Sequence, residues 1–262
     1  MLLEFFTESK IMVKNTVVYL YDFDDTRRYE FVTACVNHWR NAYIDEDELN
    51  ERVRELGSSR KAELSHLLPT LPHLKSGEFG EILAYMLLAE KKYSEAQCQP
   101  LKWRWKEMQD MPMHGVDVVF LRCDDPNSPN EMDYYVTNEI KSKAVKPTAA
   151  KPSQLHEAAE GAEKDINGRI SKTLVFLRNH YNKEKNYEMA RFIDRFADPV
   201  TKGSFSKYHN AVAIVDREHL QKHKDEFNPD QIANIQKIEL FLVPIANLKS
   251  IYEEVYNRTL ES

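Results

Sequence analysis

The sequence predicts an α/β protein in which helices flank a mixed sheet. Short runs rich in β-branched and aromatic residues alternate with longer segments whose apolar residues recur at helical spacing. From residue 76 the predicted order is one helix, three strands, several helices and a strand, followed by another strand and helix. With 262 residues, the chain is long enough for one large domain, or for one domain with a substantial extension.

Residues 1–70 predict an N-terminal α/β extension. Residues 12–22 carry the β-branched and aromatic side chains typical of a strand. An amphipathic helix with an acidic start is expected over residues 22–43, and a second, polar helix over residues 45–59 should end at Gly57.

A linker is expected over residues 67–77, which contain two prolines and a glycine. The core is then expected to span residues 71–262, and its first helix covers residues 76–93 with Ser76 as the N-cap. The remaining expected elements are strands at 101–108, 115–123 and 132–144, helices over 153–181 and 187–197, strands at 210–216 and 238–245, and a helix over 248–260.

Composition excludes several classes of protein. A hydrophobic content of 42% and a charged content of 30% are ordinary for a globular chain and too apolar for disorder. No apolar run approaches the roughly 20 residues that span a bilayer, and the N-terminus resembles neither a signal peptide nor an anchor. Three widely spaced cysteines favour neither a disulfide framework nor a zinc site, so we expect a cytoplasmic protein.

Positive charge is concentrated in one part of an otherwise acidic chain. Residues 141–207 carry 14 Lys and Arg against 8 Asp and Glu, whereas residues 1–140 carry 16 against 25. Such a surface is compatible with a polyanionic substrate, although a solvated lysine-rich face gives the same pattern.

Three charged residues fall on two predicted strands that otherwise have the pattern of buried strands. Asp117 lies within an apolar strand, and Glu139 and Lys141 lie two residues apart on the next one, so the latter pair shares a face. Burying an isolated charge costs several kcal/mol, which implies pairing or a bound ion. If the two strands form a hairpin, Asp117 and Glu139 converge at one end of the sheet.

Two converging carboxylates suit a Mg²⁺ ion, which prefers a few carboxylates, water and phosphate oxygens. The backbone carbonyl of Ile140 is a further expected ligand, and Mn²⁺ is a possible substitute for Mg²⁺. Lys141 is placed to position a water molecule and to stabilise charge on a phosphate. Together these groups predict hydrolysis of a phosphodiester.

This arrangement resembles the PD-(D/E)xK nuclease superfamily, whose restriction-endonuclease-like core is αβββαβ. The matching residues are the G-x-D strand (Gly115, Asp117) and the E-x-K strand (Glu139, Lys141) after an acidic helix. The resemblance implies a further carboxylate from that helix. Glu81 matches best, and Glu78 lies about one turn earlier on a nearby face.

The segments GEFGEILAYMLL, KWRWKEMQDMPMHGVDVVFL and EIKSKA are together similar to the HamA family, nuclease subunits of the Hachiman anti-phage defence system. The resemblance covers about residues 70 to 145. It implies a DNA nuclease that acts as a heterodimer with a superfamily-2 helicase subunit (HamB-like) and is held in check until DNA is sensed. Asp117, Glu139, Ile140 and Glu81 are then the expected metal-binding residues, and Asp117, Glu139, Lys141 and Glu81 the expected catalytic residues.

Several other residues have two interpretations. Lys143, Lys146 and Lys151 follow the E-x-K motif and are expected to contact the DNA backbone. His114 either caps a loop or contacts a phosphate. Trp103 and Trp105 are interpreted as packing residues rather than as platforms for bases.

Two other interpretations compete with the nuclease hypothesis. The charged pair at 139 and 141 can be a surface ion pair, with Asp117 an edge residue near a turn. A non-catalytic adaptor that retains the fold and binds DNA or a partner is the alternative function.

Overall fold

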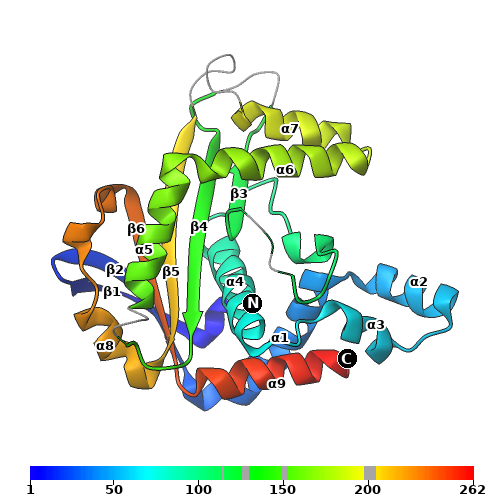
Figure 1. The fold of residues 1–262 in the computed structure, drawn as a ribbon, viewed down its shortest axis with the longest axis horizontal. Helices are drawn as coiled ribbons and strands as arrows, with labels where there is room; N and C mark the ends of the chain where they lie inside the picture. The colour runs from blue at the N-terminus through cyan, green and yellow to red at the C-terminus, as the bar shows by residue number, and fades with distance from the viewer. Residues whose placement is uncertain (112, 114, 126–129, 149–152, 198–204) are drawn as a thin grey trace.

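The protein is built on one six-stranded sheet with helices on both faces (Figure 1). A computed structural model describes residues 1–111, 113, 115–125, 130–148, 153–197 and 205–262. The strand order is β1-β2-β6-β5-β4-β3. The strands are β1 (Phe6–Val13), β2 (Thr16–Phe23), β3 (Val118–Arg122), β4 (Tyr134–Lys143), β5 (Ser206–Asp216) and β6 (Ile238–Ile245).

The sheet is mixed. Its four central strands (β2, β6, β5 and β4) are parallel, and the edge strands β1 and β3 are antiparallel to their neighbours. Parallel strands buried on both faces read as continuous apolar runs, as in β5 and β6. The predicted α/β class with a mixed, helix-flanked sheet is therefore confirmed.

Helices cover the two faces unequally. Helices α1, α4 and α9 share a large apolar core with one face of the sheet, and α5 packs on the other face through Leu155 and three alanines (Figure 1). The helices are α1 (Arg28–Tyr43), α2 (Glu46–Leu56), α3 (Arg60–Leu67), α4 (Pro72–Lys91), α5 (Gln154–Lys164), α6 (Ile170–Lys183), α7 (Tyr187–Ala197), α8 (Leu220–Asp225) and α9 (Leu248–Leu260).

The N-terminal segment differs from its prediction. Residues 12–22 do not form one strand, because β1 and β2 make a hairpin that turns at Lys14 and Asn15, both with positive φ. A two-residue loop with positive φ matches the twist of a hairpin. β2 also pairs with β6, so residues 1–70 add two strands to the common sheet. The domain boundary at residue 70 stays a prediction.

The first core helix starts earlier than predicted. Helix α4 begins at Pro72, and Ser76 lies inside it rather than at its N-cap. Proline suits the first helical position because its missing N–H has no partner there and its φ is already helical. The expected linker over residues 67–77 is thus reduced to a short connection after α3, a helix that the sequence pattern did not predict.

The prediction of a strand at residues 101–108 is wrong. Residues Lys102–Trp105 form a short 3₁₀ helix, and only a bridge between Cys98 and Leu121 pairs this region with β3. The alternating tryptophans pack in different places: Trp103 contacts Tyr85 on α4, and Trp105 contacts aromatic residues of α6. The expected run of three consecutive strands in an αβββαβ core is therefore one strand short.

The long helical segment after β4 is interrupted. Residues Asp165–Arg169 form a π-helical turn between α5 and α6, and Gly168 has a φ of 113°. Only glycine adopts such a conformation readily, which accounts for its position at the turn. Single π turns inside helices occur frequently at functional sites. The other predicted helices and strands, among them α1, α2, α7, α9, β5 and β6, are confirmed.

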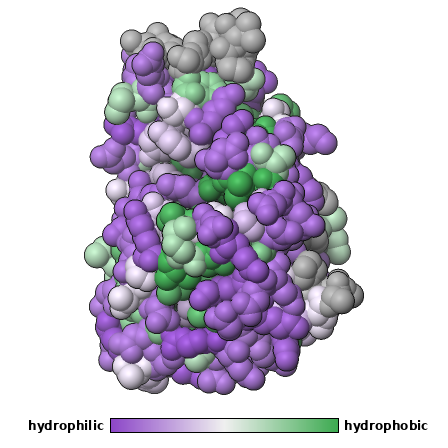
Figure 2. All heavy atoms as spheres, turned by 90° about the vertical axis from the view of Figure 1, so that its left-hand side faces the viewer, coloured by the Kyte–Doolittle hydropathy of each residue, from purple (hydrophilic) through white to green (hydrophobic). Residues whose placement is uncertain are grey.

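The surface on the side of α8 and the β1–β2 hairpin is mainly hydrophilic. Figure 2 shows small hydrophobic areas on this face, each bordered by hydrophilic side chains. Within the described part of the chain, no helix combines the length and the apolar character needed to cross a membrane.

Candidate active site

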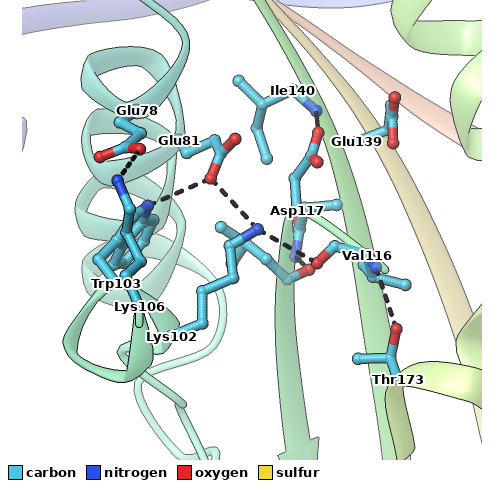
Figure 3. Close-up of polar contacts among 12 residues, drawn as sticks. Glu78, Glu81, Lys102, Trp103, Lys106, Val116, Asp117, Glu139, Ile140 and Thr173 are labelled. Carbon is cyan, nitrogen blue, oxygen red and sulfur yellow. Dashed lines mark hydrogen bonds and ion pairs between the residues drawn. The ribbon is translucent and has the colours of Figure 1, made fainter. Parts of the chain in front are cut away.

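The candidate site lies where β3 begins beside the middle of β4. The two strands pair antiparallel with Val118 opposite Asn138, so the next position in register places Asp117 opposite Glu139. The Asp117 carboxylate accepts a 2.8 Å hydrogen bond at Oδ2 from the backbone N–H of Ile140 (Figure 3). The predicted hairpin is present, and it brings the two acidic positions to the same end of β3.

Glu139 is a buried charge with two cationic partners. Its side chain is 3% exposed, and it forms ion pairs with Lys141 at 2.6 Å and with Arg169. The carboxylate lies against Gly161 of α5, where a Cβ atom would collide with it. The alternative of a surface ion pair therefore does not describe Glu139.

Lys141 remains protonated in this environment. Burial alone would lower its pKa, but the nearby carboxylates of Glu139 and Asp117 outweigh burial and raise the pKa. The Lys141 side chain is 35% exposed, so solvent reaches it. Lys141 therefore acts as a fixed positive charge rather than as a proton acceptor.

Arg169 and Asp165 belong to the site although the sequence analysis did not single them out. The Arg169 guanidinium bonds Asp165 Oδ1 at 2.5 Å, the Gly161 carbonyl at 3.0 Å, and Glu139. Asp165 is fully buried, and burial raises its pKa to about 6 despite Arg169. The available signal was an Asp and an Arg four residues apart in a helical segment interrupted by Gly168.

A second group of charges reaches the same region from α4. Glu81 Oε2 lies 3.2 Å from Lys102 Nζ and accepts a 3.2 Å hydrogen bond from Trp103 Nε1 (Figure 3). Lys102 also donates to the carbonyl of Val116, directly before Asp117. Burial raises the pKa of Glu81 to about 7, with Lys102 opposing the shift and Asp117 adding to it.

Glu78 belongs to a different cluster. Its carboxylate pairs with Lys106 at 2.5 Å and accepts a hydrogen bond from the Tyr43 hydroxyl, and these side chains are buried. The charge on Asp117 contributes to the raised pKa of Glu81, and Lys102 links Glu81 to the Val116 carbonyl before Asp117. Of the two helix carboxylates, Glu81 is thus the one oriented toward the start of β3.

The carboxylates approach from opposite faces of the sheet. Ile140 packs toward Gly80 of α4, whereas its neighbour Glu139 lies against Gly161 of α5, as the alternation of a strand requires. Glu81 is therefore on one face and Glu139 on the other, with Asp117 between them in Figure 3. Among the described residues, no three acidic, His or Cys side chains are grouped as a ready-made metal site.

A comparison with protein-family models identifies the family of this chain. The family model described as HamA matches residues 3–259 of the chain. This chain belongs to the HamA family. HamA is a component of the Hachiman anti-phage defence system, so the chain is an anti-phage defence protein. A search of curated proteins returned no match.

The donor set of this HamA family member fits Mg²⁺. Mg²⁺ usually retains several waters and binds through one or two protein carboxylates, so a group of three is not required. Asp117 and Glu139 provide two carboxylates beside the backbone of Ile140. Burial raises the pKa of Glu81 and of Asp165, so an additional cation nearby would favour their charged forms.

The expected DNA-binding lysines lie along the end of β4 and beyond it. Lys143 ends β4 and is half-buried, and Lys146 is exposed beside α8, next to His219 and Lys222. Lys151 and His114 lie outside the described residues. Lys143 shares its face of β4 with Glu139 and Lys141, which places it in line with the candidate site.

In metal-free buffer, we expect Glu81→Gln to stabilise the protein at pH 8. Burial raises the pKa of Glu81 to about 7 in the folded protein, against 4.5 for a solvent-exposed glutamate. Because the folded pKa is the higher one, the stabilising contribution is complete below pH 4.5 and is lost as the pH rises through 7. Glutamine does not ionise, so the variant avoids this decrease in the free energy of unfolding, which is at most about 3 kcal/mol.

Thermal unfolding of wild type and variant at pH 5 and pH 8 tests this expectation. The two proteins should unfold at similar temperatures at pH 5, and the variant at the higher temperature at pH 8. If the unfolding temperature falls equally for both proteins between pH 5 and pH 8, Glu81 is not the titrating group.

Proposed function

We propose that this HamA family member is a metal-dependent DNA nuclease that hydrolyses phosphodiesters with Mg²⁺, or with Mn²⁺ in its place. The observation that carries the proposal is a buried carboxylate, Glu139, held between Lys141 and Arg169 opposite Asp117. Buried charges are costly to keep, so a buried carboxylate held by two cations is a candidate for a functional role. The family resemblance supports the same chemistry.

Asp117, Glu139 and the carbonyl of Ile140 would hold the metal, which supplies Lewis acidity toward phosphate oxygens and a more acidic bound water. Lys141, a protonated side chain reached by solvent, positions the attacking water and stabilises negative charge on the phosphate. Glu81, whose pKa is raised to about 7, is suited to orient that water and exchange a proton with it, or to help hold a second ion.

The proposal assigns the delivery of DNA to a partner. The net charge of −6 argues against strong binding of DNA by the chain alone, and Lys143, Lys146 and Lys151 are the proposed contacts with the DNA backbone. A superfamily-2 helicase subunit (HamB-like) is the proposed partner in a heterodimer. We also propose that the protein works in the cytoplasm, where its three free, buried cysteines would stay reduced.

The test is cleavage of plasmid and linear DNA with Mg²⁺, repeated with Mn²⁺, by the chain alone and with its co-purified helicase partner and ATP. The E-x-K motif is removed by Glu139→Ala combined with Lys141→Ala. The matched control is Lys249→Ala combined with Glu253→Ala, which removes an exposed pair of the same charges on α9.

Cleavage by wild type and by the control, but not by the E-x-K variant, would place the chemistry at Glu139 and Lys141. Cleavage retained in the E-x-K variant would locate the chemistry elsewhere. No cleavage by wild type under any condition would leave the non-catalytic adaptor as the better description of the chain.

A further inference from the structure

A groove of about 700 Å³ opens next to the candidate active site. The segment before β3 forms one wall through Trp105, Met113 and Gly115, and α6 forms the other. Arg169, which bonds Glu139, also lines the groove, and Gly115 is two residues before Asp117. The groove therefore adjoins the site through Arg169, which bonds Glu139, and through Gly115, which is near Asp117 in the chain.

Two aromatic side chains line this groove. Trp105 and Phe176 both line it, and their ring centroids lie 6.0 Å apart. Trp105 packs on His180 at 3.9 Å, which fixes the indole ring, while Phe176 is 41% exposed. Trp105 was interpreted as a packing residue, and it packs on one side while it also faces an open groove.

Two cations accompany these rings. Lys172 is exposed on α6, one helical turn before Phe176, and no ion pair of Lys172 occurs among the described residues. Arg169 lies at the end of the groove nearest Glu139. Glu107 is an exposed carboxylate that also lines the groove. The positive side chains are thus on the α6 wall, in line with the candidate site.

Within a duplex, each base is covered on both faces by its neighbours, so a protein ring stacks only on a base that has left the duplex. Aromatic side chains beside cations along a groove are the usual means of binding a single strand, because every base has a π face and every nucleotide a phosphate. A groove with this lining therefore matches an unpaired strand better than a duplex.

We propose that this groove binds single-stranded DNA, with an unpaired base stacked on Trp105 and Phe176 and the backbone held by Lys172 and Arg169. The proposal rests on the proposed nuclease function, because it makes the groove the path by which the strand reaches Asp117 and Glu139. It also names the substrate form, which the catalytic residues alone do not determine.

Binding can be measured without cleavage. The full chain in EDTA is titrated with a labelled oligothymidine of about 16 nucleotides and with a duplex of equal length, using fluorescence anisotropy. Tryptophan emission is a second readout, because Trp39 and Trp103 are buried and Trp105 is the half-buried tryptophan of the three. We expect the single strand to bind more tightly than the duplex and to quench the emission.

Phe176→Ala and Lys172→Gln should each weaken binding of the single strand about tenfold, the effect expected for losing one stacking contact or one phosphate contact. Trp105→Phe should abolish the quenching. Val175→Ala and Lys183→Gln are matched controls, since both residues are exposed on α6 and neither lines the groove. These controls should bind as wild type does.

Equal affinity for single strand and duplex, or binding unaffected by Phe176→Ala and Lys172→Gln, would overturn the groove proposal even if the protein cleaves DNA. Binding that follows the groove variants, in a protein that never cleaves, would keep the groove and reject the nuclease. The two proposals therefore fail separately.

Discussion

Asp117→Asn should leave the protein folded and lower DNA cleavage at least about a hundredfold. An asparagine side-chain oxygen still accepts the hydrogen bond that Asp117 Oδ2 receives from the Ile140 N–H, so the local structure is kept. The negative charge that would hold the metal is lost. Mutating a residue that only supports a metal ligand typically lowers metal affinity or activity about 10- to 100-fold. Mutating a direct ligand should therefore lower it more.

Cleavage rate, Mg²⁺ dependence and thermal unfolding are measured together for this variant. Asp110→Asn is the matched control, because Asp110 also accepts a 2.8 Å bond from a backbone N–H, that of Thr70, and is not part of the candidate site. The control should cleave normally. Unchanged cleavage by Asp117→Asn would exclude Asp117 as a metal ligand.

The sheet was largely predictable because its strands have clear patterns. β5 and β6 contain continuous apolar runs next to loop-forming residues, and their identity did not depend on distant contacts. The β1–β2 hairpin was missed because Lys14 and Asn15 are not the Asn-Gly pair that usually marks a two-residue turn. In the segment at 101–108, alternation of two tryptophans imitated a strand, although each ring packs against a different helix.

The site was predictable only where the motif lies on regular strands. Asp117, Glu139 and Lys141 follow from strand pairing and alternation. Lys102 and Arg169 do not, because one lies in the 3₁₀ helix mistaken for a strand and the other follows the positive-φ turn at Gly168. Both are cationic partners of predicted carboxylates, so sequence reasoning found the acids and Lys141 but missed these two other bases.

The presence of those partners explains how the acidic residues are tolerated. Glu81 pairs with Lys102, and Glu139 with Lys141 and Arg169. Removing a cation from the buried Glu139 leaves its negative charge undercompensated, whereas a bound metal would supply an equivalent positive charge. The ion pairs of Glu139 and the proposed metal therefore compete for the same carboxylate, and Arg169 must shift if Glu139 is to bind a metal through Oε2.

Gly161→Ala should both destabilise the protein and abolish cleavage. In the interior of a helix, alanine is favoured over glycine by about 1 kcal/mol, so helix propensity alone predicts a more stable variant. The new Cβ atom would collide with the Glu139 carboxylate, which is buried and cannot move without breaking its ion pairs with Lys141 and Arg169. We expect a net loss of about 1–3 kcal/mol, as for other overpacked positions.

Gly77→Ala in α4 separates the effect of helix propensity from the effect of the collision. It makes the same substitution inside a helix, and nothing lies within 4 Å of its added Cβ atom. Gly77→Ala should therefore gain about 0.5–1 kcal/mol, whereas Gly161→Ala loses stability, as measured by urea unfolding. If both variants gain stability and both cleave DNA, then Glu139 does not lie against α5, and the ion pairs that position it at the site are not those of the active protein.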